Sequence, residues 1–280
     1  MILIADSGST KTQWCLVNQQ GKHWLKTGGL NPFFDGAALT EKEVGRHQLL
    51  RDHHHAVEKI FFYGAGCGSD KNCRKMQAAL QRLFPQARVS VESDLLGAAR
   101  GIFGDRKGIA GILGTGSNSG LYNGKNILLS TPSLGYILGD EGSGSHLGKK
   151  LLYACFHNQM PDALRKKFRQ QHPESNAALL DQLYHHPFPN RFMAGFTPFI
   201  HENQQHPFMQ ALLQQAFGQF LQLIKDYYPA DMRSSIRLTG SVAANFRDII
   251  GKIATEKGLE IENIVSSPLE GLMDYHLPEG

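Results

Sequence analysis

The chain has 280 residues, of which 41% are hydrophobic and 19% are charged, and its formal net charge at pH 7 is +4. This composition is typical of a globular protein with one large or two medium-sized domains. It argues against a membrane or nucleic-acid partner, because no stretch approaches the roughly 18–20 apolar residues of a membrane helix and the scattered Lys and Arg residues form no basic stripe.

The N-terminal segment predicts a strand, a small polar turn and a returning hairpin. The apolar residues 2–5 are typical of a short buried strand, and the turn after them reads Asp6-Ser7-Gly8-Ser9-Thr10-Lys11-Thr12. Residues 13–17 and 22–26 then predict two more strands around a Gln20-Gly21 turn. Because the chain runs directly into this strand and not into a signal peptide, we expect a cytoplasmic protein.

After this meander the sequence predicts alternating helices and strands. Residues 71–84 carry apolar side chains at helical spacing, the segment 40–53 starts with an N-cap and an acidic first turn, and the strands are short apolar or alternating runs. We expect helices over residues 40–53, 71–84 and 94–101, and strands over residues 60–63 and 88–92. A three-strand meander followed by this alternation is the element order of a ribonuclease H-like module.

The second half of the chain begins with the same pattern. Residues 108–113 predict a buried strand, and the polar turn after it reads Gly114-Thr115-Gly116-Ser117-Asn118-Ser119. A hairpin follows over residues 120–130 around Asn123-Gly124. This near-repeat predicts two domains, over residues 1–106 and 107–280, whereas one continuous α/β domain is the alternative.

The remaining residues enlarge the second domain. We expect helices between residues 141 and 228, a strand at 235–239, a helix over 242–257, a strand at 259–262 and a short terminal helix. The long helical region is an insertion into the repeated module, and we expect the terminal helix to pack back on the first domain.

The two glycine turns are candidates for binding a polyphosphate. Glycine lets the backbone approach a ligand closely, consecutive N–H groups form anion-binding nests, and Ser and Thr hydroxyls add donors. Asp6 would repel a bare phosphate, but Mg²⁺ reverses this repulsion because it prefers carboxylate, water and phosphate oxygens. We therefore predict a Mg²⁺-nucleotide ligand, with ordinary hairpin turns as the alternative. Neither turn matches the Walker P-loop or the dinucleotide-binding fingerprint.

Three further segments carry candidate site residues. Asp94 lies between a strand end and a helix start, where it can accept the proton of an attacking hydroxyl in phosphoryl transfer or simply cap the helix. Asp140 and Glu141 lie between glycines at a helix start, where they can accept hydrogen bonds from sugar hydroxyls or interact with the helix dipole. Gly240-Ser241 forms a strand-to-helix turn that can border an adenine or its ribose.

Together these segments resemble the sugar kinase, actin and Hsp70 superfamily of ATPases. Within it the chain is similar to the N-acetylglucosamine kinases and their relatives, the activator ATPases of benzoyl-CoA reductase and 2-hydroxyacyl-CoA dehydratase. The resemblance rests on four ordered strings: Asp6 to Thr12, Gly114 to Asn118, Gly139-Asp140-Glu141-Gly142-Ser143 and Thr239-Gly240-Ser241-Val242. It implies an α/β fold of two ribonuclease H-like (actin-like ATPase) domains with an interdomain cleft that closes over ATP and Mg²⁺, and a homodimer.

By motif match, the resemblance also assigns roles to single residues. The first phosphate loop would be formed by Asp6, Gly8, Ser9, Thr10, Lys11 and Thr12, with Asp6 at the metal. The second would be formed by Gly114, Thr115, Gly116 and Ser117, while the adenosine would be bordered by Gly240 and Ser241. Asp94 would be the base for the sugar 6-hydroxyl, and the other sugar contacts would be Asn31, Thr115, Asn118 and Asp140.

The implied reaction is the ATP-dependent phosphorylation of an amino sugar, with the conversion of N-acetylglucosamine to its 6-phosphate as the leading expectation. The kinase family tends to have a Trp shortly before its Gly-Asp-Glu-Gly string, where this chain has Leu134, so glucosamine and N-acetylmuramic acid stay open as substrates. An activator ATPase with a [4Fe-4S] cluster is an alternative, although Cys155 is the one cysteine of the second half. A sugar-sensing binding protein is another.

Overall fold

The computed structural model describes residues 1–233 and 235–277, without the side chains of residues 33–37. The chain divides into two compact units. The first unit comprises Met1–Gly111, Gly120–Leu129 and the C-terminal segment from Ser267, and the second comprises Ile112–Ser119 and Ser130–Ser266. The first unit is thus built from three separate stretches of the sequence.

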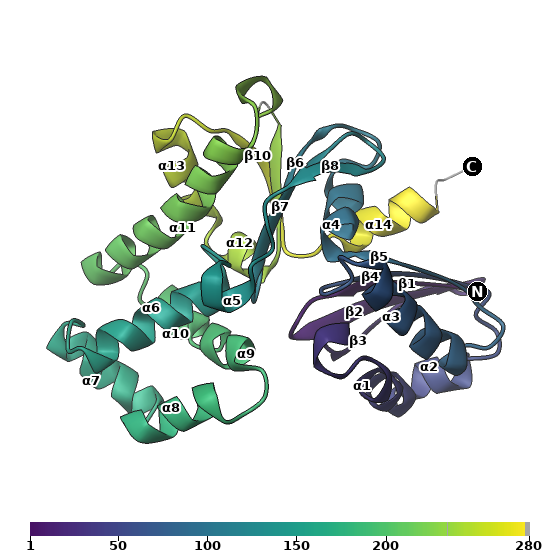
Figure 1. Ribbon diagram of the computed structural model, residues 1–280, viewed down its shortest axis with the longest axis horizontal. Helices are drawn as coiled ribbons and strands as arrows, with labels where there is room; N and C mark the ends of the chain where they lie inside the picture. The colour runs from purple at the N-terminus through teal and green to yellow at the C-terminus, as the bar shows by residue number, and fades with distance from the viewer. Residues whose placement is uncertain (234, 278–280) are drawn as a thin grey trace. The chain divides into compact units, whose positions relative to one another are not determined.

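The sheet of the first unit has five strands in the order β3-β2-β1-β4-β5 (Figure 1). Its strands are β1 (Ile2–Ser7), β2 (Lys11–Asn18), β3 (Gly21–Gly28), β4 (Lys59–Gly64) and β5 (Arg88–Ser93). Strand β1 pairs antiparallel with β2 and parallel with β4, and β4 pairs parallel with β5. The three parallel strands therefore end at one edge of the sheet.

Helices cover both faces of this sheet. They are α1 (Pro32–Arg46), α2 (Gln48–Asp52), α3 (Asp70–Leu83), α4 (Asp94–Phe103) and α14 (Leu269–His276). Successive side chains of a strand point to opposite faces, and accordingly Leu3 packs with Met76 of α3, whereas Ile4 packs with Leu272 of α14. The N-terminal strand is thus buried on both sides.

The second sheet has the strand order β10-β9-β6-β7-β8. Its strands are β6 (Gly108–Leu113), β7 (Ser117–Tyr122), β8 (Ile127–Ser130), β9 (Ile236–Thr239) and β10 (Ile261–Val265). Strands β9 and β10 are parallel. As in the first sheet, a glycine-containing turn joins two strands that follow each other in sequence, here β6 and β7.

The helices of the second unit fill most of residues 135–256. They are α5 (Gly135–Leu138), α6 (Gly144–Phe156), α7 (Asp162–Gln171), α8 (Asn176–Tyr184), α9 (Pro189–Ala194), α10 (Thr197–Glu202), α11 (Pro207–Tyr227), α12 (Ser241–Asn245) and α13 (Arg247–Glu256). The long helix α11 buries residues three or four positions apart, such as Leu213, Phe217 and Phe220, as expected for a helix with one core-facing side. No described helix is both long and apolar enough to cross a membrane.

The predicted α/β class with two sheets is confirmed, and two helices differ from the expected boundaries. The helix expected over residues 40–53 starts eight residues earlier, at Pro32, and is interrupted at His47, whose backbone is extended (φ −83°, ψ 114°). Proline suits the first position of a helix because its missing N–H has no partner to lose there. The helix expected over 242–257 is split at Phe246, which is buried 5.6 Å from the ring of Phe217.

Candidate active site

The parallel strands of the first sheet end in register. Ser7 of β1 pairs with Gly64 of β4, and Gly64 pairs with Ser93 of β5. Asp6 is the penultimate residue of β1, and Asp94 directly follows β5 as the first residue of α4. Ligands of α/β folds bind at this carboxyl edge of the strands, so the structure brings the two carboxylates singled out in the sequence to the same edge.

Asp6 and Asp94 lie close enough to influence each other electrostatically. Burial, and then the negative charge of Asp94, raise the pKa of Asp6 from 3.8 to about 7. A hydrogen bond from Ser267 and the positive charge of Lys11 oppose this increase. Two carboxylates held together favour a proton or a cation between them, because both cannot be charged without cost.

The chemistry of this pair fits Mg²⁺. Carboxylate oxygens are hard donors, and Mg²⁺ bound to a nucleotide takes only one or two of them while phosphates and waters complete its octahedron. Among the described residues, no group of three or more His, Cys, Asp or Glu side chains is placed to enclose a metal ion. Asp6 and Asp94 therefore suit a cation that arrives with its phosphates.

Buried hydroxyls hold the β1–β2 turn in shape. The N–H of Leu30 donates to Ser7 Oγ at 3.1 Å, Ser7 Oγ lies 2.7 Å from Thr12 Oγ1, and Thr12 Oγ1 donates to the Gly28 carbonyl at 3.0 Å. Ser7 and Thr12 are both fully buried. Motif matching predicts a phosphate contact for the Thr12 hydroxyl, which in this structure forms buried hydrogen bonds with Ser7 and Gly28.

Gly29 packs directly on the backbone of the same turn. Its N–H donates to the Thr10 carbonyl at 3.0 Å, and a Cβ at this position would lie 2.3 Å from the Ser9 carbonyl oxygen. Thr10 and Lys11 remain exposed at the tip of the turn, where their side chains can reach a ligand. Asn31 follows two residues after Gly29 and is 7% exposed.

In the second unit, a distant carboxylate supports the β6–β7 turn. The N–H of Gly114 donates to the Gly116 carbonyl at 3.0 Å, and the N–H of Ser117 donates to Asp140 Oδ1 at 3.1 Å. Asp140 has a left-handed backbone (φ 62°), which its short polar side chain tolerates. Burial raises the pKa of Asp140, the Ser117 N–H lowers it, and the charge of Glu141 raises it further.

The start of helix α6 also holds this turn. The N–H groups of Gly144 and Ser145 donate to the carbonyls of Gly114 and Thr115, at 2.8 and 3.0 Å. The Ser143 hydroxyl caps α6 by accepting the N–H of His146 at 3.2 Å. Because helix N-terminal N–H groups otherwise lack partners, these bonds tie the turn and the helix together.

A small pocket opens beside the β6–β7 turn. It is lined by Ser117, Asn118, Ser119, Thr131, Pro132, Leu134, Asp140, Glu141, Phe220 and Leu223. Its lining combines polar side chains with the apolar side chains of Leu134 and Phe220. The pocket brings together two residues with predicted sugar contacts, Asn118 and Asp140, and Leu134 beside them is 56% exposed.

Gly240 packs on the backbone at the end of β6. Its φ of +116° and the 2.3 Å between its ideal Cβ position and the Leu113 carbonyl oxygen both require glycine. Its N–H donates to the Val265 carbonyl at 3.0 Å, and Ser241 after it is exposed. Thr239 before it is 2% exposed, and its hydroxyl has no hydrogen-bond partner among the described residues.

The predicted site residues thus fall into two groups. Those in the first unit are Asp6, Gly8, Ser9, Thr10, Lys11, Thr12, Asn31 and Asp94, and those in the second are Gly114, Thr115, Gly116, Ser117, Asn118, Asp140, Gly240 and Ser241. The sequence analysis missed Ser267, whose hydroxyl reaches Asp6 across 261 positions. A Ser-Pro pair before a helix was the only local signal there.

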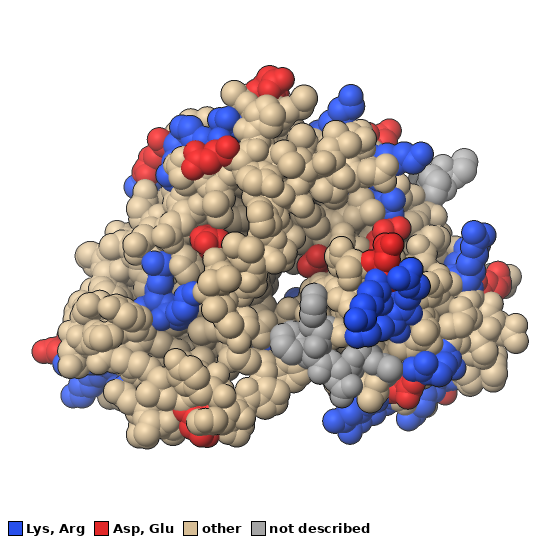
Figure 2. Space-filling model, viewed as in Figure 1, with Lys and Arg blue, Asp and Glu red and all other residues tan. Residues whose placement is uncertain are grey.

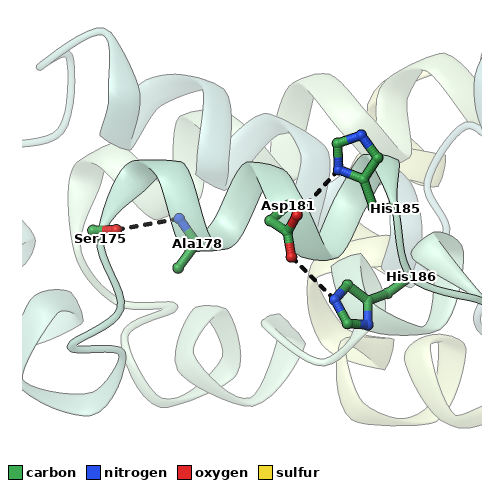
Figure 3. A network of polar contacts seen from close by, with 5 residues as sticks. All are labelled: Ser175, Ala178, Asp181, His185 and His186. Atoms are coloured by element: carbon green, nitrogen blue, oxygen red, sulfur yellow. Dashed lines mark hydrogen bonds and ion pairs between the residues drawn. The ribbon is translucent and has the colours of Figure 1, made fainter.

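A second polar cluster lies at the end of helix α8. Asp181 lies between two imidazoles, with His185 Nδ1 3.1 Å from one carboxylate oxygen and His186 Nε2 3.0 Å from the other (Figure 3). These hydrogen bonds lower the pKa of Asp181. At the other end of α8, Ser175 caps the N–H of Ala178. Side-chain hydrogen bonds thus support both ends of α8, through Ser175 at its start and Asp181 at its end.

Charged side chains are mixed on the visible surface. On the face shown in Figure 2, Lys and Arg lie in several separate groups, and most groups have Asp or Glu nearby. This pattern matches the scattered basic residues of the sequence.

No protein-family model and no curated protein matches the chain, whereas solved structures do. A candidate N-acetylglucosamine kinase from Porphyromonas gingivalis is 37% identical, with a TM-score of 0.89 over 99% of this chain and 98% of that chain. A candidate N-acetylglucosamine kinase from Chromobacterium violaceum is 18% identical, with a TM-score of 0.72 over 98% of each chain. A ROK family glucokinase from Streptomyces griseus, in complex with glucose and AMPPNP, is 18% identical, with a TM-score of 0.56 over 98% of each chain.

The two more distant similarities show a shared fold only. The similarity to the Porphyromonas gingivalis protein goes further, because it combines 37% identity with nearly complete coverage of both chains. It confirms the family resemblance that the ordered strings predicted. The chain belongs to the N-acetylglucosamine kinase-like family of ATP-dependent sugar kinases, within the sugar kinase, actin and Hsp70 superfamily.

Proposed function

We propose that this sugar kinase transfers the γ-phosphate of Mg-ATP to the 6-hydroxyl of an N-acetylated amino sugar, with N-acetylglucosamine as the first candidate. The observation that carries this proposal is the meeting of Asp6 and Asp94 at the carboxyl edge of the first sheet. Phosphoryl transfer needs one carboxylate at the metal and one at the attacking hydroxyl.

Asp94 is the proposed general base. Its carboxylate stands at the first position of α4, where the helix dipole favours negative charge, and its Oδ1 accepts the N–H of Leu95 at 2.9 Å. The carboxylate would orient the sugar hydroxyl and take its proton as the bond to phosphorus forms. Asp6 would hold Mg²⁺, which when bound neutralises charge on the phosphate oxygens.

In the second unit, we assign the Gly114–Ser117 turn to the phosphates and Gly240-Ser241 to the adenosine, on the strength of the motif match. Asn118 and Asp140 line the small pocket and would bind sugar hydroxyls. The apolar side chains of this pocket, including Leu134 and Phe220, would contact the methyl group of an acetamide. These apolar side chains are what favours an N-acetylated sugar over glucosamine in this proposal.

The first test is ADP release from Mg-ATP with a panel of N-acetylglucosamine, N-acetylmuramic acid, N-acetylmannosamine, glucosamine and glucose. We expect stimulation by an N-acetylated sugar, with the product phosphorylated at the 6-position. Preference for glucosamine or glucose would contradict the proposed contact between the apolar side chains and the acetamide. ATP hydrolysis that no sugar stimulates would contradict the proposed reaction and favour an activator-type ATPase.

The second test removes the base without changing its shape. Asp94→Asn is expected to lower kcat by about 100-fold or more, because general-base catalysis contributes about 10²–10⁴-fold, while nucleotide binding stays near that of the wild type. Asp70→Asn is a matched control, since Asp70 also stands first in a helix after a capping serine, Ser69, as Asp94 does after Ser93. Near-normal turnover of Asp94→Asn would remove Asp94 from the mechanism.

A further inference from the structure

The C-terminal segment of the first unit reaches the candidate metal ligand. Ser267 Oγ donates to Asp6 Oδ2 at 3.4 Å, and the N–H of Leu269 donates to Ser267 Oγ at 3.3 Å. Because the hydroxyl oxygen accepts the Leu269 N–H, its own proton is available for the carboxylate. The two bonds connect Asp6 through Ser267 to the start of α14.

Close helix packing holds Ser267 in place. Helix α14 lies against α4, which begins with Asp94 (Figure 1). A Cβ at Gly271 of α14 would lie 1.8 Å from the Gly101 carbonyl oxygen, and a Cβ at Gly101 would lie 2.4 Å from the Pro268 carbonyl oxygen. The backbones of the two helices therefore touch, which leaves little freedom to the segment that carries Ser267.

Side chains anchor both ends of α14 to the sheet. Leu269 and Leu272 pack in one buried cluster with Ile4, which lies two residues before Asp6 on β1. At the far end, His276 Nε2 lies 2.7 Å from the Tyr63 hydroxyl, and the His276 ring stacks on Phe61 at 3.7 Å between centroids. The helix is thus a fixed part of the first unit, and it presents Ser267 to Asp6.

We propose that Ser267 is a positioning residue for the metal-nucleotide site: its hydroxyl binds one oxygen of Asp6 and holds the carboxylate in the orientation that receives Mg²⁺. This inference rests on the proposed function. Asp6 has a second carboxylate near it, Asp94, so without a donor on one oxygen its side chain would turn away from the like charge. Ser267 acts through Asp6 and touches no reacting atom.

The test compares variants that differ in the hydroxyl but not in shape. Ser267→Val and Ser267→Ala remove the hydroxyl, Ser267→Thr keeps it in a side chain of the same shape as Val, and Ser266→Ala is the control, because Ser266 is the exposed neighbour. The midpoint of unfolding without ligand is measured first, to show that each variant folds. The Mg²⁺ dependence of AMPPNP binding is then titrated, and KM for Mg-ATP and for the sugar are determined.

We expect Ser267→Val and Ser267→Ala to need about 5- to 20-fold more Mg²⁺ for half-maximal AMPPNP binding, as for loss of a hydrogen bond to a charged group. KM for Mg-ATP should rise similarly and KM for the sugar should not. Ser267→Thr and Ser266→Ala should resemble the wild type. An unchanged Mg²⁺ midpoint in Ser267→Val and Ser267→Ala, or equal weakening in Ser267→Thr, would overturn the inference.

The binding titration separates this inference from the proposed function. If the wild type binds AMPPNP in a Mg²⁺-dependent manner but phosphorylates no sugar, the proposed function fails and the role of Ser267 is still decided by the titration. If the wild type binds no nucleotide at any Mg²⁺ concentration, both are wrong.

Discussion

The turns β1–β2 and β6–β7 follow the same strand-turn-strand pattern, but different parts of the chain support them. In the first turn, hydroxyls of Ser7 and Thr12 and backbone groups up to Leu30 form the supporting bonds. In the second turn, support comes from Asp140, 23 residues after Ser117, and from the start of helix α6. One turn is therefore held by its own surroundings and the other by a later segment.

The two turns also differ in which part of the chain supplies their carboxylate. The first turn carries its carboxylate on its own strand, as Asp6, whereas the last two residues of β6, Ile112 and Leu113, are uncharged. The second turn obtains its negative charge from Asp140. Under the proposed function, the first turn would bind the metal, and the second would bind phosphate and uncharged groups of the sugar. This difference between the turns can be tested by mutation and by pH.

Neutralising the two carboxylates one at a time should change activity the most. Asp6→Asn should lower kcat/KM for Mg-ATP by about 100-fold or more, because the charged oxygen at the cation is lost. Asp140→Asn keeps an oxygen that accepts the Ser117 N–H, so we expect a loss of about 10-fold or less, mainly as a higher KM for the sugar. A greater loss of Mg-ATP efficiency in Asp140→Asn than in Asp6→Asn would invert the assigned roles.

The second effect concerns the glycine that packs on each turn. Gly29→Ala and Gly240→Ala place a Cβ 2.3 Å from the Ser9 and Leu113 carbonyl oxygens, and each should lower the free energy of unfolding by about 2–4 kcal/mol in urea titrations. The controls are Gly45→Ala and Gly251→Ala, where a Cβ meets nothing within 4 Å. Equal stability of the test and control variants would show that the turns yield to accommodate the methyl group.

Loss of the Asp6 carboxylate should also change the pH dependence of stability, by a smaller amount. The folded pKa of Asp6 is about 7 and the ordinary value is 3.8, so the folded state binds the proton more tightly and loses stability as pH rises between these values. His276, with a folded pKa lowered by burial from 6.5 to about 4, produces the opposite slope over part of this range. The difference between wild type and Asp6→Asn removes the contribution of His276.

Thermal unfolding of both proteins without Mg²⁺ between pH 4 and 8 measures this difference, around the folded pKa of about 7. We expect the wild type to lose stability relative to Asp6→Asn as pH rises through this range. A constant difference would mean that Asp6 stays ionised throughout this range and that its pKa is not raised.

The meeting of Asp6 and Asp94 was predictable from sequence because each follows a predicted strand, and parallel strands of one sheet end at the same edge. The bond between Ser267 and Asp6 was not predictable, because nothing local specifies which of the chain's serines will lie near a residue 261 positions away. The buried hydrogen bond of the Thr12 hydroxyl was not predictable either. The place of Thr12 in a polar turn indicates a ligand contact as readily as the buried bond to Gly28 that the structure shows.

The three-part composition of the first unit has a consequence for how the protein is made. Ribosomes deliver the N-terminal sheet first, yet Leu269, Leu272 and Met273, which cover one of its faces beside Ile4, emerge only after the entire second unit. Until then the nascent sheet exposes an apolar face, the kind of surface that chaperones bind. The unit that begins the chain is therefore the last that can be completed.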